Sequence, residues 1–114
     1  VAFCPFASRA AFEVWIVGKR PSPYFEHITD EEKFTLAQAL KQSLYSIHKG
    51  LNDPAYNFYI HTAPCDGRDY EHYQWHIEII PHTSTWAGFE LSTGIEVSTI
   101  QPEEAAKYLR EQLQ

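Results

Sequence analysis

Hydrophobic and polar residues alternate along residues 70–81, and the rest of the chain is organised around this stretch. An alternation of period two predicts a β-strand, whose side chains point to opposite faces in turn. The core face would carry four apolar or aromatic residues: Tyr73, Trp75, Ile77 and Ile79. The opposite face would carry Gln74, His76, Glu78 and Ile80. One face is therefore predicted to be core and the other to carry chemistry.

Two further runs are rich in β-branched and aromatic residues and predict strands over residues 12–17 and 55–61. The second run ends in His61. If it pairs antiparallel with the strand in 70–81, His61 can join His76 and Glu78, because side chains two residues apart on a strand are only about 6.5 to 7 Å apart. The pattern thus predicts a cluster of two imidazoles and one carboxylate.

Helical signals occur at two places. Thr29 and Glu32 have the spacing of a capping box, which predicts a helix that starts there and ends near Gly50. Its packing stripe would consist of Leu36, Leu40, Leu44, Ile47 and Leu51. Pro102 fits the first position of a second helix. That helix would pack through Ala105, Ala106, Leu109 and Leu113.

Between these helices, residues 82–88 are typical of a loop, residues 89–91 of a short extended piece and residues 93–100 of a further strand. The order is strand, helix, several strands, helix. Short connections favour antiparallel pairing, so we expect an α+β fold in which two helices pack on an antiparallel sheet. A chain of 114 residues has room for one core, and residues 1–114 are predicted to form a single domain.

Composition narrows the function. A formal net charge of −6 argues against binding to a phosphate backbone, so no nucleic-acid partner is expected. No apolar run approaches the length of a membrane span and no signal peptide is evident, which predicts a cytoplasmic protein without membrane contact. Cys4 and Cys65 are expected to be reduced. The chain starts at Val1 and contains no methionine, so we expect a piece of a longer protein.

His61, His76 and Glu78 are a competent ligand set for zinc or iron. Hydrogen-bonded residues on the concave face of a half-solvated sheet are the simpler interpretation of the same three side chains. His76 could instead act as a nucleophile, with Glu78 or Gln74 orienting its ring. Glu96 could accept a pair of sugar hydroxyls while Phe89 or Trp86 stacks on the ring, although a surface glutamate is the simpler reading.

Several short motifs, taken together, resemble one family. They follow one another along nearly the whole chain: Cys4-Pro5-Phe6-Ala7, Phe12-Glu13-Val14-Trp15-Ile16, His61-Thr62-Ala63-Pro64, Trp75-His76-Ile77-Glu78-Ile79-Ile80-Pro81, Gly88-Phe89-Glu90, Thr93-Gly94-Ile95-Glu96 and Pro102-Glu103-Glu104-Ala105-Ala106. In this order they resemble the C-terminal half of the galactose-1-phosphate uridylyltransferase family, within the histidine-triad superfamily. The resemblance implies a histidine-triad-like sheet and a role in galactose or related carbohydrate metabolism.

The resemblance also implies how the parent protein works. Members of the family resemble two fused histidine-triad domains and transfer a nucleoside monophosphate between sugar 1-phosphates through a nucleotidyl-histidine. Their nucleophile lies in a His-Pro-His motif of the N-terminal half, and this chain contains no such motif. By resemblance, the chain is the second domain, which binds sugar 1-phosphate and nucleotide-sugar ligands, helps to hold a structural metal ion and contributes to a homodimer.

Individual roles carry over by position. His61 and His76 match two ligands of a structural zinc or iron site, and Glu78 stands where a third histidine is common. The family's remaining ligand is a glutamate of the other half. Glu96 matches a hexose-contacting glutamate, with Gly94 and Phe89 beside it in the substrate-binding segment. The glycine and phenylalanine pattern is closer to the branch that includes ADP-glucose phosphorylases.

Three functional hypotheses follow. The leading one is a C-terminal domain of a sugar-1-phosphate nucleotidyltransferase that is inactive without its N-terminal catalytic domain. The second is a free-standing histidine-triad-like nucleotide hydrolase or transferase that uses His76. The third is a binding module that has kept the fold without the chemistry.

Overall fold

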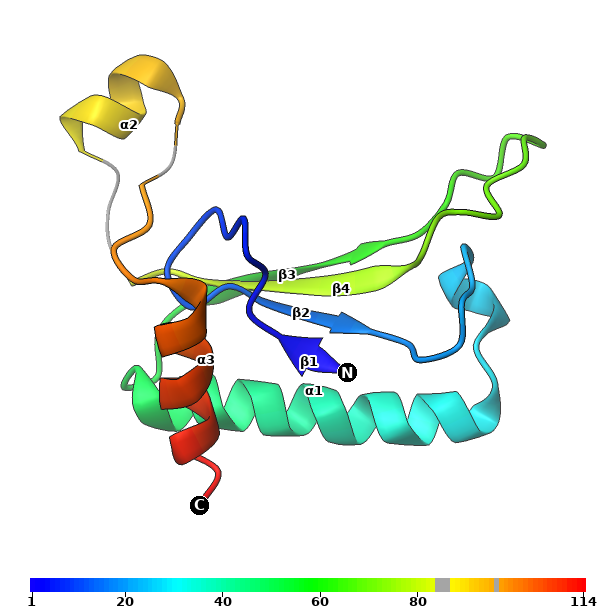
Figure 1. Cartoon of the computed structure of the whole chain (residues 1–114), viewed down its shortest axis with the longest axis horizontal. Helices are drawn as coiled ribbons and strands as arrows, with labels where there is room; N and C mark the ends of the chain where they lie inside the picture. The colour runs from blue at the N-terminus through cyan, green and yellow to red at the C-terminus, as the bar shows by residue number, and fades with distance from the viewer. Residues whose placement is uncertain (84–86, 96) are drawn as a thin grey trace.

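The computed structural model describes residues 1–83, 87–95 and 97–114, and it is an α+β fold as predicted (Figure 1). The elements follow in the order β1 (Ala2–Phe3), β2 (Val14–Val17), a 3-10 helix η1 (Phe25–His27), α1 (Asp30–Gly50), β3 (Tyr56–His61), β4 (His76–Pro81), α2 (Gly88–Thr93) and α3 (Pro102–Glu111). The four strands form one sheet in the order β1-β2-β4-β3, and every neighbouring pair is antiparallel.

Strand β4 lies inside the sheet and forms its core face as the alternation predicts. Trp75, Ile77 and Ile79 are each at most 2% exposed. They face α1, which runs along one side of the sheet (Figure 1). The strand begins only at His76, because the backbone N–H of Trp75 donates to the Ser22 carbonyl (3.0 Å) and not to a neighbouring strand. The first part of the predicted stretch is therefore a loop.

Helix α1 starts with the predicted capping box. The Thr29 hydroxyl accepts from the backbone N–H of Glu32, and the Glu32 carboxylate accepts from the backbone N–H of Thr29, both at 3.1 Å. Ile47 is 1% exposed at the centre of the packing stripe. Among the described residues, α1 and the other helices include none that is both long and apolar enough to cross a membrane.

Helix α3 packs against the end of α1, and the absence of a side chain at Gly50 makes room for it. A Cβ atom at Gly50 would lie 3.0 Å from the Tyr108 ring and 2.9 Å from Gln112. The Tyr108 hydroxyl donates to the Gly50 carbonyl (2.7 Å). Of the four residues predicted to pack, Ala105 and Leu109 are buried, Ala106 is partly buried and Leu113 is 46% exposed.

Two predictions about the segment before α3 were wrong. Residues 89–91 are not extended but lie within α2, where the Glu90 carboxylate accepts from the backbone N–H of Ala87 (3.2 Å) and Gly94 ends the helix at φ 72°. No strand is formed by the described residues in 93–95 and 97–100. Ile95 and Val97 alternate as a strand would, but both are about half exposed, since no strand lies beside them to bury that face. Glu96 lies outside the described residues.

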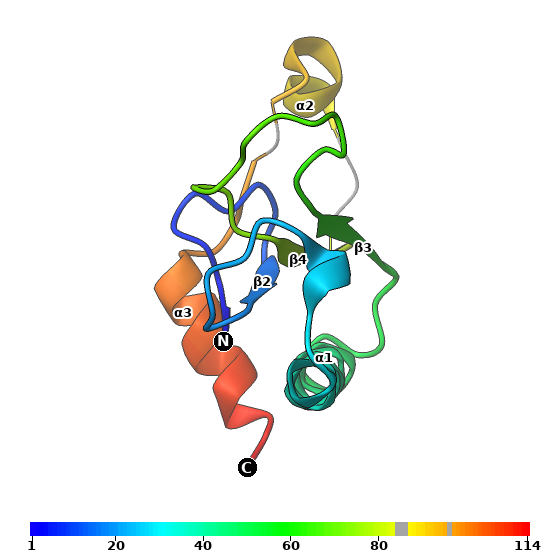
Figure 2. The same ribbon diagram turned by 90° about the vertical axis from the view of Figure 1, so that its right-hand side faces the viewer.

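Two parts of the molecule carry apolar side chains into solvent. β3 is an edge strand in which every residue is exposed, including Tyr56, Phe58, Tyr59 and Ile60. Helix α2 stands away from the sheet on the side opposite α1, in both views (Figure 1, Figure 2). On it Phe89 and Leu91 are 56% and 71% exposed. The fold thus has a well-formed core on one side of the sheet. Strand β3 and the projecting helix α2, called the α2 arm below, are left uncovered.

The cross-strand pair Ile77 and Ile60 gives a test of this asymmetry. The two residues are partners on the same face of β4 and β3, yet Ile77 is 2% exposed and Ile60 45% exposed. Ile77→Ala should lower the free energy of unfolding by about 2–5 kcal/mol, the cost of a core truncation. Ile60→Ala should cost under about 1 kcal/mol. Urea unfolding of both variants measures this. Equal losses would mean that β3 is covered in solution.

Candidate functional site

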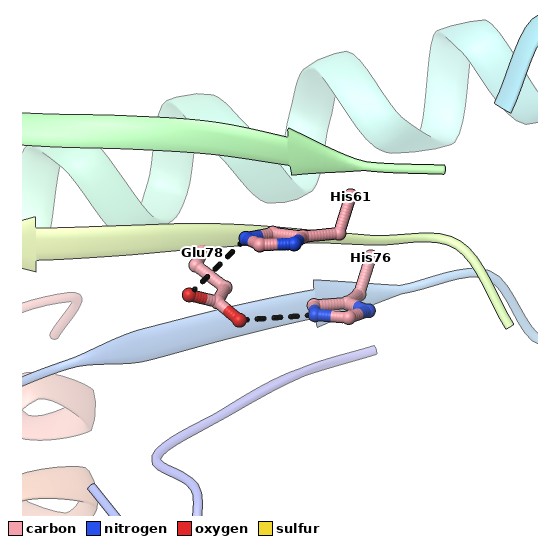
Figure 3. A group of neighbouring side chains, drawn as sticks. All are labelled: His61, His76 and Glu78. Carbon is pink, nitrogen blue, oxygen red and sulfur yellow. Dashed lines mark hydrogen bonds and ion pairs between the residues drawn. The ribbon is translucent and has the colours of Figure 1, made fainter. Parts of the chain in front are cut away.

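The pairing of β3 with β4 places His61 directly opposite His76, and Glu78 lies two residues further along β4. One nitrogen of each histidine and one carboxylate oxygen of Glu78 all lie within 4.8 Å of one another (Figure 3). The predicted antiparallel pairing therefore brings the three side chains together. They lie on the face of the sheet opposite α1.

Stacking of aromatic rings fixes how the two imidazoles are oriented. The His61 and His76 rings are parallel within 3°, with centroids 4.9 Å apart. The other side of His76 is covered by the Trp15 ring, whose centroid is 4.4 Å away at an angle of 16°. Because His76 is held between two planes, its Nε2 atom is directed along the sheet toward Glu78 (Figure 3). The Nε2 atoms of His76 and His61 lie 3.0 and 3.5 Å from Glu78 Oε1 and Oε2.

Each of the two ring nitrogens of His76 faces a hydrogen-bond acceptor. Its Nδ1 atom lies 3.2 Å from the Gln74 carbonyl, which can only accept, so this contact is a hydrogen bond in the tautomer with the proton on Nδ1. Its Nε2 atom faces the Glu78 carboxylate at 3.0 Å. A lone pair on Nε2 would repel that carboxylate, so either a proton or a cation must stand between them. An imidazole that donates from one nitrogen to a backbone carbonyl is the usual arrangement of a metal-ligating histidine.

Glu78 is 5% exposed, and a second buried acid lies beside it, Glu13 at 1%. The Arg9 guanidinium joins them, with Nη2 2.6 Å from Glu78 Oε2 and 3.5 Å from Glu13 Oε1. Glu13 also accepts from the backbone N–H of Arg9 (2.6 Å) and from the Trp15 indole (3.1 Å). Phe12 precedes this acid in a left-handed conformation, φ 64°, which turns the chain into β2. Each buried carboxylate is thereby paired, as burial requires.

Sequence reasoning missed Arg9 and Glu13 as parts of this site. Arg9 lies in an irregular segment without periodicity. Glu13 carried a signal that could have found it, namely an acid at the start of an otherwise apolar strand. Such a residue is expected to have a buried partner.

The donor set fits zinc or iron. Two imidazole nitrogens and a carboxylate oxygen are ligands that both metals accept, and they lie within 4.8 Å of one another. The metal role of these residues stays a prediction.

The other predicted site residues lie elsewhere or are engaged. Both nitrogens of His76 already face partners, so a nucleophilic role would require Glu78 to move. Phe89 and Gly94 lie on the α2 arm and at its end, away from the histidine pair (Figure 1). Glu96 and Trp86 lie outside the described residues.

Both cysteines are free, as predicted. Burial raises the pKa of the Cys4 thiol to about 11, an effect that Arg110 partly opposes. Cys65 is exposed and donates to Glu26 across 3.7 Å. A protonated thiol is a poor nucleophile, so Cys4 has the character of a structural residue.

Comparison with known proteins gives relatives over nearly the whole chain. No protein-family model matches. The chain is 40% identical to ADP-glucose phosphorylase from Arabidopsis thaliana over 97% of its own length and 32% of that protein. The crystal structure of an ADP-glucose phosphorylase from the same plant, with bound ADP-glucose, aligns with a TM-score of 0.89 at 38% identity, over 96% of this chain and 36% of that one.

A uridylyltransferase structure aligns with a TM-score of 0.87 at 31% identity, over 98% of this chain and 38% of that one. The resemblance to the galactose-1-phosphate uridylyltransferase family is therefore confirmed. A Hit-like protein from Bartonella henselae aligns with a TM-score of 0.69 at 19% identity, which confirms the histidine-triad-like fold and nothing further. The chain spans about a third of the length of the ADP-glucose phosphorylase and uridylyltransferase relatives.

Two Glu–His pairs of different burial allow the Glu78 network to be tested. Glu78→Gln keeps the shape but turns an acceptor into a donor that faces Arg9 or His76. We expect the free energy of unfolding to fall by about 1–3 kcal/mol. The matched change Glu71→Gln breaks a solvent-exposed pair with His72 and should cost within about 0.5 kcal/mol. Urea unfolding at neutral pH measures both, and similar values would show that the buried network contributes no stability.

Proposed function

We propose that this chain is the C-terminal domain of a sugar-1-phosphate nucleotidyltransferase whose nucleophilic histidine lies in a separate N-terminal half. The observation that carries the proposal is homology along nearly all of this chain to about a third of each relative. A region of that size in a larger enzyme is expected to supply part of a site. The chain itself contains no His-Pro-His sequence.

The exposed edge of the sheet supports a missing neighbour. An edge strand leaves a row of backbone N–H and C=O groups unpaired, and soluble proteins usually protect such an edge. β3 instead exposes Phe58, Tyr59 and Ile60 together with its free edge. Contact with the N-terminal half at β3 would bury this surface and continue the sheet. His61, at the end of β3, would then lie close to that half.

The α2 arm is proposed to contribute to the sugar 1-phosphate site. It carries Phe89, whose exposed ring can pack on the apolar side of a hexose, and it ends at Gly94. Glu96 would accept sugar hydroxyls. Since the arm projects away from its own sheet, its natural contact is another subunit, so we propose that a homodimer completes the site (Figure 2).

His61, His76 and Glu78 would hold a zinc or iron ion with a structural role. When bound, the ion supplies a link between β3 and β4 and takes no part in bond making. The Gln74 carbonyl holds His76 in the protonation state that presents Nε2. A fourth ligand would come from the N-terminal half, so the ion would also join the two halves.

For the nucleotide, we propose an adenine nucleotide sugar. The identity to ADP-glucose phosphorylase is 40%, against 31% to the uridylyltransferase structure. The reaction class would be the reversible transfer of a nucleoside monophosphate from a nucleotide sugar to a phosphate acceptor. The residues of this chain would bind and orient the sugar phosphate.

Metal binding tests the structural part of the proposal. The chain should bind about one zinc per molecule, measured by competition with a chromogenic chelator. His61→Ala and His76→Ala should each weaken binding by more than about 100-fold, because loss of an outer partner alone costs about 10–100-fold. His72→Ala is the control, since that side chain is 94% exposed and pairs with the exposed Glu71. Equal affinity in all four proteins would contradict the site.

Reconstitution tests the catalytic part. The chain alone should not consume ADP-glucose or UDP-glucose. Activity should appear when the N-terminal half of a relative, with its His-Pro-His motif, is supplied. Phe58→Asp on β3 should reduce the recovered activity at least about tenfold by placing a charge in the contact. Phe34→Asp is the matched control, because Phe34 is 66% exposed and belongs to α1 and not to the edge strand.

Other results would favour the remaining hypotheses. Turnover by the chain alone that His76→Ala abolishes would support a free-standing histidine-triad-like enzyme. Sugar-phosphate affinity that Glu96→Ala removes, without turnover in any combination, would support a binding module.

A further inference from the structure

The contact between Arg9 and the carboxylate of Glu78 restricts what that carboxylate can do. Arg9 Nη2 lies 2.6 Å from Oε2, closer than either histidine ring lies to this carboxylate. The His76 ring lies 3.0 Å from Oε1, whereas the His61 ring lies 3.5 Å from Oε2, beside Arg9. The two oxygens of one carboxylate are therefore not equivalent: a strong donor already occupies Oε2.

Arg9 is itself held in place. Its backbone N–H and its guanidinium both donate to Glu13, at 2.6 and 3.5 Å. Glu13 is 1% exposed and is fixed further by the Trp15 indole. The Arg9 side chain is about half exposed, but its Nη2 atom lies between the buried carboxylates of Glu13 and Glu78. Arg9 is therefore fixed in position beside Glu78, unlike a residue of a surface ion pair.

A carboxylate can bind a metal ion through one oxygen or through both. Zinc is satisfied by four ligands, whereas manganese favours more, and harder, oxygen ligands. Holding Oε2 in a hydrogen bond favours ligation through Oε1 alone. The set then has two nitrogens and one oxygen, which suits zinc.

We propose that Arg9 is a positioning residue that selects the metal: by occupying Glu78 Oε2, it keeps Glu78 a one-oxygen ligand and so favours zinc over manganese. The inference rests on the proposed metal site of His61, His76 and Glu78. Glu13 acts in the same direction by clamping Arg9. Neither residue ligates the ion.

The test is the ratio of the zinc and manganese dissociation constants, measured for the 114-residue chain and three variants. Both ions carry the same charge, so removal of the Arg9 charge changes both affinities by a similar factor and cancels in the ratio. Arg9→Met should shift the ratio toward manganese by about tenfold, the lower end of outer-partner effects. Arg9→Lys, which keeps a charged donor, should stay within about threefold of the parent.

Glu13→Gln is the third variant and should shift the ratio in the same direction as Arg9→Met, by a smaller factor, because Arg9 is then less firmly held. Co²⁺ substitution gives an independent signal: the visible absorption should weaken in Arg9→Met as the coordination number rises. Circular dichroism confirms that each variant is folded. A purely structural role would not move either readout in a folded variant.

Two results would overturn the inference, and they are distinguishable. If zinc and manganese affinities change by the same factor in Arg9→Met and Glu13→Gln, Arg9 acts only through its charge and the metal site itself stands. If the parent chain binds neither ion, the proposed metal site fails and the role of Arg9 fails with it.

Discussion

The burial of a negative charge at Glu78 is the constraint on which the polar face of the sheet depends. A carboxylate that is 5% exposed loses its hydration and must be compensated by donors or cations. Three groups do this from three segments: His76 on β4, His61 on β3 and Arg9 in the loop before β2. One buried acid therefore ties together two strands and a loop on the side of the sheet opposite the hydrophobic core.

The sequence predicts the elements whose pattern is carried within them. Strand β4 has period two, and α1 has both a capping box and a helical stripe, so local physics determines them. The strand predicted over residues 93–100 does not form, although Ile95 and Val97 alternate correctly. A strand also needs a neighbouring strand to pair with, and the sequence of the segment does not reveal whether one is present. The same limit explains why Arg9 was missed, because its contacts are with two acids, one of them 69 residues away.

For the candidate site, sequence reasoning found the cluster of two histidines and one glutamate and missed the residues that support it. His61, His76 and Glu78 were recognisable because strand alternation and antiparallel pairing place them on one face. The order of the stack Trp15, His76 and His61 depends on the relative twist of three strands, which no single segment reveals. Arg9 shows no sequence pattern that marks it, because its role depends on its contact with Glu78, which is distant in the sequence.

The location of the histidine pair also follows from how weakly β3 is attached. All six residues of β3 are exposed, so burial of apolar surface contributes little to holding the strand. Its attachment rests on the backbone ladder with β4 and on the contact of His61 with His76 and Glu78. A metal ion in the proposed site would add a link between the strands at the end of this ladder. Such a link would act at the same edge of the sheet at which the proposed N-terminal half would join.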